Sequence, residues 1–220
     1  MPVTLLSVMA VQQNDPTELL EVFTRAGEPT GVAKDRAAIH LDGDWHVAFH
    51  CWVLRGRGQR VLLQQRSMRK DTFPGCWDAA AAGHWRFRES AAEAAREIAE
   101  ELGIEVGFEQ LQYRGRERSA RRMPNSLIDR ELHEVYVLCD ERPLLTFRPD
   151  PAEVMGLAVF TLSDVLELAA GQRSRGNAVE AVHVDADGSL TPTTLSVGQS
   201  DLVPYSAARL RRMLWRACTS

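Results

Sequence analysis

The segment from Ser90 to Gly103 is the feature that most limits the folds open to this chain. Ser90 and Glu93 stand three residues apart in the pattern of a capping box, and Gly103 supplies a stop signal. The apolar positions between them recur at helical spacing, and they are Ala91, Ala94, Ala95, Ile98 and Leu102. The pattern predicts a helix with one apolar face, which needs a packed core to cover it.

The same helix carries three carboxylates on one face. Glu97, Glu100 and Glu101 occupy positions i, i+3 and i+4. Two unit charges about 4 Å apart interact by roughly 4 kcal/mol at an effective dielectric near 20, so such a cluster favours a bound cation. Mg²⁺ prefers oxygen ligands and is commonly shared between carboxylates and substrate phosphates. The spacing indicates a divalent-cation site, and a solvated acidic face paired with arginines is the alternative.

Strand patterns surround this helix. Residues 45–54 are rich in aromatic and β-branched side chains, and a Gly-containing turn separates them from residues 61–66, which predicts a hairpin. A short strand is expected within residues 77–83. Further strands are expected within residues 104–116 and 131–142 and at the start of residues 154–171, where a helix capped by Ser163 follows. These elements predict a mixed sheet with helices.

Arginines crowd the predicted connection between two of these strands. They are Arg114, Arg116, Arg118, Arg121 and Arg122. A solvated basic loop is one interpretation, and a loop that folds over a cleft and contacts phosphates is the other. Because only Tyr113 lies beside them, the arginines do not establish an RNA-binding surface.

The chain divides into three predicted parts. Residues 1–17 form a loose leader, residues 18–170 a domain that opens with a strand-turn pattern, and residues 171–220 an extension with a terminal helix packed on the domain. A length of 220 residues suits one core, and 45% apolar with 25% charged residues is ordinary for a globular protein.

The net charge and the cysteines limit the classes of partner and the cellular compartment that we expect. A net charge of -4 gives no global attraction to DNA or to a membrane surface, and no apolar run reaches the roughly 18 residues that a membrane span needs. Four cysteines stand far apart with no CxxC pair, so we expect reduced thiols in a cytoplasmic protein.

The text GHWRFRESAAEAAREIAEELGI resembles the Nudix box, which is written as G, five residues, E, seven residues and then REUxEExGU with U aliphatic. REIAEELGI matches in full, with Gly83 and Glu89 at the first two fixed positions. The resemblance implies that Glu97, Glu100 and Glu101 ligate the metal. Only six residues separate Glu89 from Arg96, so Glu89 is expected to be displaced, and Glu93 is a substitute for it.

Outside the box the resemblance is closest to the branch that includes isopentenyl-diphosphate isomerase. WHVAFHCWVL, QQRSMRKDTFPGCWDAAAAGH and HEVYVL carry it. Ala82 stands where that isomerase has its catalytic cysteine, and Leu132 where it has a second metal-ligating glutamate. A methyl group cannot exchange a proton with an allylic carbon, so isomerase activity is not expected.

The same branch suggests further site residues. Arg66 and Lys70 fall where the isomerase holds its substrate diphosphate, and His84 is expected to line the pocket. His46 and His84 match metal-binding histidines of that enzyme, and His40 lies within one residue of a third. Cys76 is expected to be a small packed residue.

The resemblance implies an α/β fold, a Nudix-type α/β/α sandwich with a mixed sheet and a C-terminal helical extension. It implies a hydrolase that cleaves a diphosphate linkage in a small nucleoside-diphosphate-type or other substrate with Mg²⁺ or Mn²⁺. Arg96, Glu100 and Glu134 are the expected catalytic residues. A homodimer stays open as an assembly, and an isomerase-like enzyme and a non-catalytic ligand-binding Nudix module are the alternatives.

Overall fold

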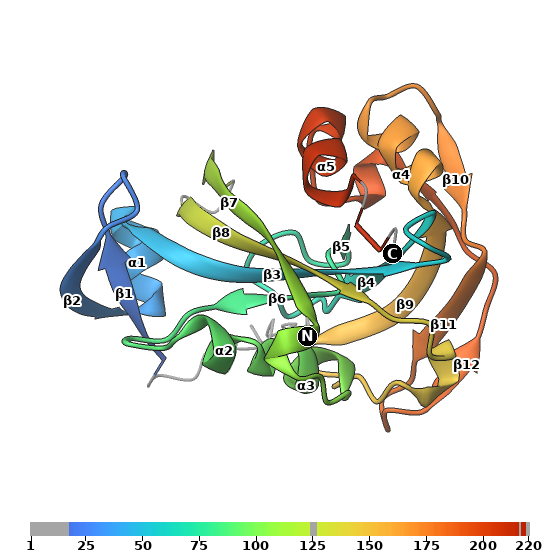
Figure 1. Cartoon of the computed structure of the whole chain (residues 1–220), viewed down its shortest axis with the longest axis horizontal. Coiled ribbons are helices and arrows are strands. Elements are labelled where there is room, and N and C mark those ends of the chain that lie inside the picture. The colour runs from blue at the N-terminus through green and yellow to red at the C-terminus, as the bar shows by residue number, and fades with distance from the viewer. Residues whose placement is uncertain (1–17, 124–126, 216, 219–220) are drawn as a thin grey trace, which may run out of the picture.

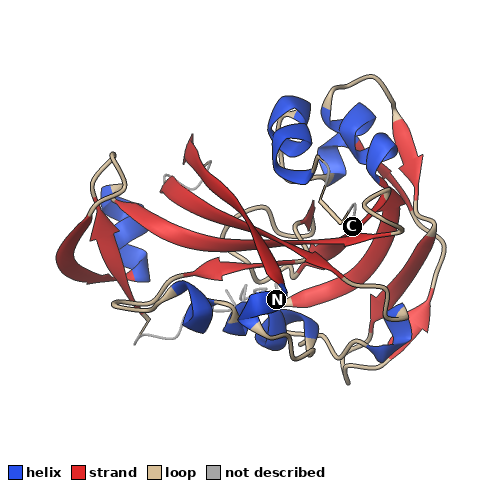
Figure 2. Cartoon of the chain, in the orientation of Figure 1, coloured by secondary structure: helices blue, strands red, loops and turns tan. Residues whose placement is uncertain are grey.

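The fold is a mixed sheet with helices on both of its faces (Figure 1 and Figure 2). The computed structural model describes residues 18–123, 127–215 and 217–218. The leader predicted at residues 1–17 lies outside this range.

Along its main path, the sheet has the strand order β12-β11-β9-β4-β3-β1-β2. Off this path, β5 pairs with β4, β6 with β3, and β8 with both β3 and β7. The strands are β1 (Leu19–Phe23), β2 (Pro29–Asp35), β3 (Trp45–Arg55), β4 (Arg60–Arg66), β5 (Trp77–Asp78), β6 (Ala81–His84), β7 (Leu111–Arg122), β8 (Ile128–Cys139), β9 (Val154–Thr161), β11 (Glu180–Val184) and β12 (Leu190–Pro192).

Strand β3 organises the sheet. One of its edges pairs in parallel with β8, from Trp45 opposite Arg130 to Leu54 opposite Cys139. It also pairs antiparallel with β4, which confirms the predicted hairpin, and with β6, where His50 stands opposite Ala82. Because β3 contacts β4, β6 and β8, side chains from all three can meet around it.

Alternation along the strands separates the core into two layers. In β3, Phe49 and Val53 pack in the layer of Ile98, whereas Trp52 and Leu54 pack in the layer of Leu210. Side chains of a strand point alternately to opposite faces, so each face buries its own helices. The helices are α1 (Arg36–Asp42), α2 (Ala91–Ala94), α3 (Arg96–Leu102), α4 (Leu162–Ala169) and α5 (Ala207–Leu214). This arrangement confirms the predicted α/β/α sandwich.

The predicted helix over residues 90–102 forms as two helices. Ser90 and Glu93 make the expected capping box at the start of α2, and Gly103 ends α3 in the left-handed conformation at φ 63°. The helix is interrupted at Ala95, which forms a turn between α2 and α3. The segment that is one residue shorter than the family pattern thus contains the interruption between α2 and α3.

Two expectations about local structure are corrected. The Arg-rich segment is the long strand β7 rather than a connection, because it pairs with β8 from Leu111 to Arg122. Helix α4 is capped by Thr161 rather than Ser163, since the Thr161 hydroxyl accepts from the Asp164 amide at 3.1 Å.

The expectation that all four cysteines are reduced thiols is also corrected. Cys139 and Cys218 form a disulfide with their Cα atoms 5.7 Å apart, while Cys51 and Cys76 are free thiols. A separation of 79 residues gave no local signal of this pairing. The disulfide joins the end of β8 to the C-terminal end of the described chain.

Residues after 170 contribute to both the sheet and a separate small ladder. Strand β11 pairs with β9 in the main sheet, and β10 (Arg175–Asn177) pairs with β13 (Ser196–Gly198). Helix α5, capped by Ser206, buries Leu210, Met213 and Leu214 in the core shared with β3 and β4. The domain boundary at residue 170 stays a prediction.

Candidate active site

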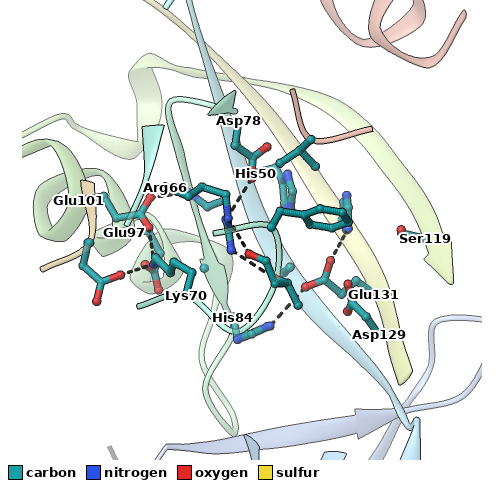
Figure 3. Close-up of a pocket in the computed structure, with 18 of the residues that line it drawn as sticks. His50, Arg66, Lys70, Asp78, His84, Glu97, Glu101, Ser119, Asp129 and Glu131 are labelled. Carbon is teal, nitrogen blue, oxygen red and sulfur yellow. Dashed lines mark hydrogen bonds and ion pairs between the residues drawn. The ribbon is translucent and has the colours of Figure 1, made fainter. Parts of the chain in front are cut away.

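A cavity of about 390 Å³ lies where β3, β4, β6 and β8 meet helix α3. Figure 3 shows Glu97, Glu101 and Lys70 at one end, Glu131 and Asp129 at the other, and Arg66 and His50 between them. The cavity collects most of the predicted site residues: Arg66, Lys70, His84, Arg96, Glu97, Glu100 and Glu101.

Two carboxylates of α3 are buried against β6. Glu97 is 8% exposed and Glu101 is 1% exposed. The Glu101 carboxylate accepts from the Ala82 amide at 2.8 Å and from Gln64 Nε2 at 2.6 Å. A Cβ atom on Gly83 would overlap the Glu97 carboxylate, so this glycine lets the strand approach the helix.

These carboxylates fit a divalent cation. Burial, followed by the charge of Glu101, raises the pKa of Glu97 from 4.5 to about 8, so the metal-free protein holds its negative charge at a cost. Hard oxygen donors crowded on one wall of a cavity are the ligand set that Mg²⁺ or Mn²⁺ accepts. Glu97 and Glu101, with the half-exposed Glu100, are the residues that would hold it.

Arg96 ties the ligands together. Its guanidinium donates to Glu89 at 2.8 Å, to Glu100 at 2.7 Å, to Glu97, and to the carbonyl of His84 at 3.1 Å. Glu89 therefore contacts the metal helix through Arg96 despite the short spacing, and its displacement relative to the family pattern stays a prediction. Glu93 instead serves the capping box, where its Oε2 accepts from the amide and the hydroxyl of Ser90.

Two cations, Arg66 and Lys70, line the same cavity. Arg66 donates to Asp78 at 3.1 Å and to the Thr72 carbonyl and hydroxyl at 3.1 and 3.2 Å. Lys70 pairs with Glu101 at 3.0 Å and also with Glu153. Both side chains line the cavity and both are anchored by carboxylates, so they place fixed positive charge beside the metal helix.

Three imidazoles lie close together, and one of them, His84, lines the cavity. The ring centroids of His40, His46 and His84 lie 4.9 to 5.3 Å apart, and His84 Nε2 lies 3.3 Å from Glu131. Burial lowers the pKa of His40 to about 4 and that of His84 well below its ordinary value, so both rings are neutral at physiological pH. Among the described residues, the buried Nε2 of His46 has no hydrogen-bond partner. These nitrogens and Glu131 have the chemistry of a second cation site.

Strand β8 supplies different side chains from those expected. Glu134 does not line the cavity, since alternation turns it to the other face, where Tyr113 donates to it at 2.6 Å and Arg116 pairs with it. Asp129, Glu131 and His133 face the cavity instead. His133 Nε2 lies 2.6 Å from Glu131, and the imidazoles outweigh the effect of burial and hold the pKa of Glu131 well below its ordinary value. The expected role of Glu134 on the attacking water is therefore corrected.

The sequence analysis missed several residues of the cavity, and most of the crowded arginines lie outside it. Of the five crowded arginines, Arg121 lines the cavity, whereas Arg114 donates to the carbonyls of Met213 and Trp215. His50, Asp78 and Tyr205 were missed. Alternation along residues 129–133 could have found the β8 set, but no local signal marks Tyr205.

The fold and the carboxylate helix together define a Nudix hydrolase. The NUDIX domain family matches residues 44–181, and the chain belongs to this family. Among the described residues, no helix combines the length and the apolar character that crossing a bilayer requires.

Relatives agree with this assignment. An uncharacterised Nudix hydrolase of Clostridium acetobutylicum is 30% identical over 86% of this chain and 91% of its own length. An isopentenyl-diphosphate Delta-isomerase of Saccharopolyspora erythraea is 35% identical over 64% of this chain and 71% of its own length. Nudix hydrolase 3 of Arabidopsis thaliana is 49% identical over 67 residues, and the match spans 9% of that protein.

A solved structure shares the fold. The crystal structure of DR0079 from Deinococcus radiodurans matches with a TM-score of 0.52 and 21% identity, over 70% of this chain and 90% of that one. At this identity the similarity concerns the fold alone.

Proposed function

We propose that the chain is a divalent-metal-dependent hydrolase of a diphosphate linkage in a small molecule. The observation that carries the proposal is the pair of buried carboxylates, Glu97 and Glu101, in a cavity that Arg66 and Lys70 also line. Acidic metal ligands and anchored cations in one cavity suit a diphosphate, whose oxygens bind both a metal ion and positive side chains. A bound Mg²⁺ or Mn²⁺ would neutralise phosphate charge and favour attack by water.

We assign the water-activating role to Glu100. Its side chain is 48% exposed, against 11% for Glu97, so it is the metal-helix carboxylate with most access to water. Arg96 holds one of its oxygens at 2.7 Å and leaves the other toward solvent near Arg86. Arg96 is a positioning residue, because every contact it makes is to a carboxylate or to the His84 carbonyl.

We assign diphosphate binding to Arg66 and Lys70, with His84 beside them. A guanidinium has five N–H groups. Three of those of Arg66 donate to Asp78 and Thr72, and the others are left as donors for phosphate oxygens. The substrate is a nucleoside-diphosphate-type molecule or another small diphosphate. A homodimer stays a prediction.

An isomerase is the second candidate, favoured by the relative from Saccharopolyspora erythraea and by the His40, His46, His84 cluster. Ala82 opposes it, since a methyl group lines the cavity where that enzyme family has its cysteine. A non-catalytic module is opposed by the intact set of Glu97, Glu100 and Glu101.

A substrate panel tests the proposal. Nucleoside diphosphates, nucleotide sugars, dinucleotides, coenzyme A and prenyl diphosphates would be incubated with Mg²⁺ or Mn²⁺ and the products identified by ³¹P NMR. We expect metal-dependent release of a phosphate or pyrophosphate product from at least one of them. Absence of hydrolysis across the panel with both metals would contradict the proposal.

A further inference from the structure

The chain that enters α5 forms part of the cavity wall. Val203 donates from its amide to the Trp77 carbonyl at 2.9 Å, and Leu202 forms a parallel bridge to Trp77. This contact fixes the segment against β5, and two residues later Tyr205 lines the cavity with 8% of its surface exposed. A residue more than a hundred positions after the metal helix thus reaches the same cavity.

The hydroxyl of Tyr205 supports the anchor of Arg66. It donates to Asp78 Oδ1 at 2.8 Å, while Asp78 Oδ2 accepts from Arg66 Nη1 at 3.1 Å. Asp78 is 4% exposed, so its carboxylate is held by these partners and by the Ala79 amide at 2.7 Å rather than by bulk water. One of the three hydrogen bonds that orient the guanidinium is therefore linked through Asp78 to Tyr205, and the other two go to Thr72.

The same hydroxyl selects a tautomer of His50. Its single proton goes to Asp78, so its oxygen is the acceptor toward His50 Nδ1, 3.4 Å away. His50 Nδ1 then carries the ring proton, and Nε2 keeps a lone pair. His50 stands opposite Ala82 in the antiparallel ladder, so the two side chains share one face. His50 and Ala82 both line the cavity, so Nε2 is the acceptor nitrogen of a ring in its wall.

A second contact from the same segment fixes the neighbouring ring. Arg209 Nη2 lies 2.6 Å from His133 Nδ1, and a guanidinium can only donate, so His133 accepts there and donates through Nε2 to Glu131. The rings of His50 and His133 stack with centroids 3.9 Å apart and planes 12° apart. Burial, then the neighbouring His133, lowers the pKa of His50 well below its ordinary value, which agrees with a neutral ring.

We propose that Tyr205 is a positioning residue of the diphosphate site, which orients the Arg66 guanidinium through Asp78 and sets His50 as a hydrogen-bond acceptor toward the cavity. The C-terminal segment is then a working part of the active site. The Arg66 half of this inference rests on the proposed function, because it takes Arg66 to contact a diphosphate. The His50 half stands on the hydrogen bonds alone.

The test is a double-mutant cycle with a non-hydrolysable ligand. The affinity of methylene diphosphonate in the presence of Mg²⁺ would be measured by calorimetry for the wild type, Tyr205→Phe, Arg66→Lys and the double variant. We expect Tyr205→Phe to weaken binding about tenfold in the wild-type background and less than twofold in the Arg66→Lys background, because residues that act through one another are not additive. Tyr136→Phe is the matched control, since Tyr136 is buried to a similar degree on the opposite face and its variant should bind as the wild type does.

A second measurement separates this inference from the proposed function. The ¹⁵N shifts of the His50 ring should report an Nδ1–H tautomer in the wild type, and Tyr205→Phe should abolish that preference while Tyr136→Phe keeps it. An Nε2–H tautomer in the wild type, or equal weakening of diphosphonate binding in both backgrounds, would overturn the inference. If the wild type binds the ligand and shows the Nδ1–H tautomer but hydrolyses no diphosphate, the proposed function fails and Tyr205 keeps its role.

Discussion

The backbone amide of Ala82 donates a hydrogen bond of 2.8 Å to the buried carboxylate of Glu101. This bond joins the strand that lines the cavity to the helix that carries the acidic ligands. Ala82 thus contributes its backbone to the site although its side chain has no reactive group. The relationship explains how a metal helix on one face of the sheet can serve a cavity that opens largely on the other.

Replacement of Arg66 should separate substrate binding from metal binding. Arg66→Lys keeps a charge but loses the planar fork that Asp78 and Thr72 orient, so we expect the Michaelis constant of the best substrate to rise about tenfold. The Mg²⁺ concentration for half-maximal activity should change less than twofold. Arg211→Ala, on the exposed side of α5, is the control. Unchanged kinetics in Arg66→Lys would remove Arg66 from the diphosphate site.

The stability of the metal-free protein should respond to the charge of Glu97. Its folded pKa of about 8 lies above the ordinary value of 4.5, so the folded state favours the protonated acid. The stability that this proton supplies is present below about pH 4.5 and declines as the pH rises toward 8. Glu97→Gln mimics the protonated form and should not show this decline.

Thermal unfolding in a chelating buffer would measure the effect. Between pH 6 and pH 8 the wild type should lose up to about 2.7 kcal/mol relative to Glu97→Gln, at about 1.4 kcal/mol per pKa unit, and Mg²⁺ should restore it. A constant difference in melting temperature between the two proteins across this range would show that Glu97 is already ionised without metal.

The disulfide should stabilise the whole chain. Cys139 and Cys218 are 79 residues apart, and closing a loop of this length is worth roughly 4 kcal/mol in the chain-entropy view. Reduction should lower the melting temperature of the wild type by about 10 °C and leave Cys218→Ser unchanged. Thermal scans with and without a phosphine reductant would show this. Equal melting temperatures in the wild type would mean that the bond does not form in solution.

The sequence predicts the layers and the metal helix because their signals are local. The capping box of Ser90 and Glu93, the Gly103 stop and the hairpin of β3 and β4 each lie within a few neighbouring residues. The helix break at Ala95 was not predicted, since a missing residue can be absorbed at several places.

Long-range contacts account for the residues that were not foreseen. Whether Glu131 or Glu134 faces the cavity depends on the register of β8 against β3, and a shift of one residue reverses the faces. Tyr205 reaches Asp78 across 127 positions of sequence, and the partner of Cys139 lies at the other end of the extension. None of these contacts leaves a periodic pattern in the chain.

The protein should not interconvert isopentenyl and dimethylallyl diphosphate. The cavity offers the Ala82 methyl group where the resemblance to the isomerase requires a cysteine, and Leu132, which stands at the position of its second ligating glutamate, is buried outside the cavity. Incubation of the purified protein with isopentenyl diphosphate and Mg²⁺ or Mn²⁺ should leave the double bond in place. Formation of dimethylallyl diphosphate at about 1 per second or faster would overturn the hydrolase assignment.

The most direct test of the carboxylate helix is the turnover of Glu100→Gln and Glu101→Gln at saturating Mg²⁺ with the best substrate of the panel. Each variant keeps the shape of the side chain and removes one anionic ligand. We expect turnover to fall at least about a hundredfold, which is roughly 2.7 kcal/mol in barrier, while the exposed control Glu105→Gln stays within twofold of the wild type. Wild-type turnover in both variants would contradict the account, because α3 would then be only an acidic face of the fold.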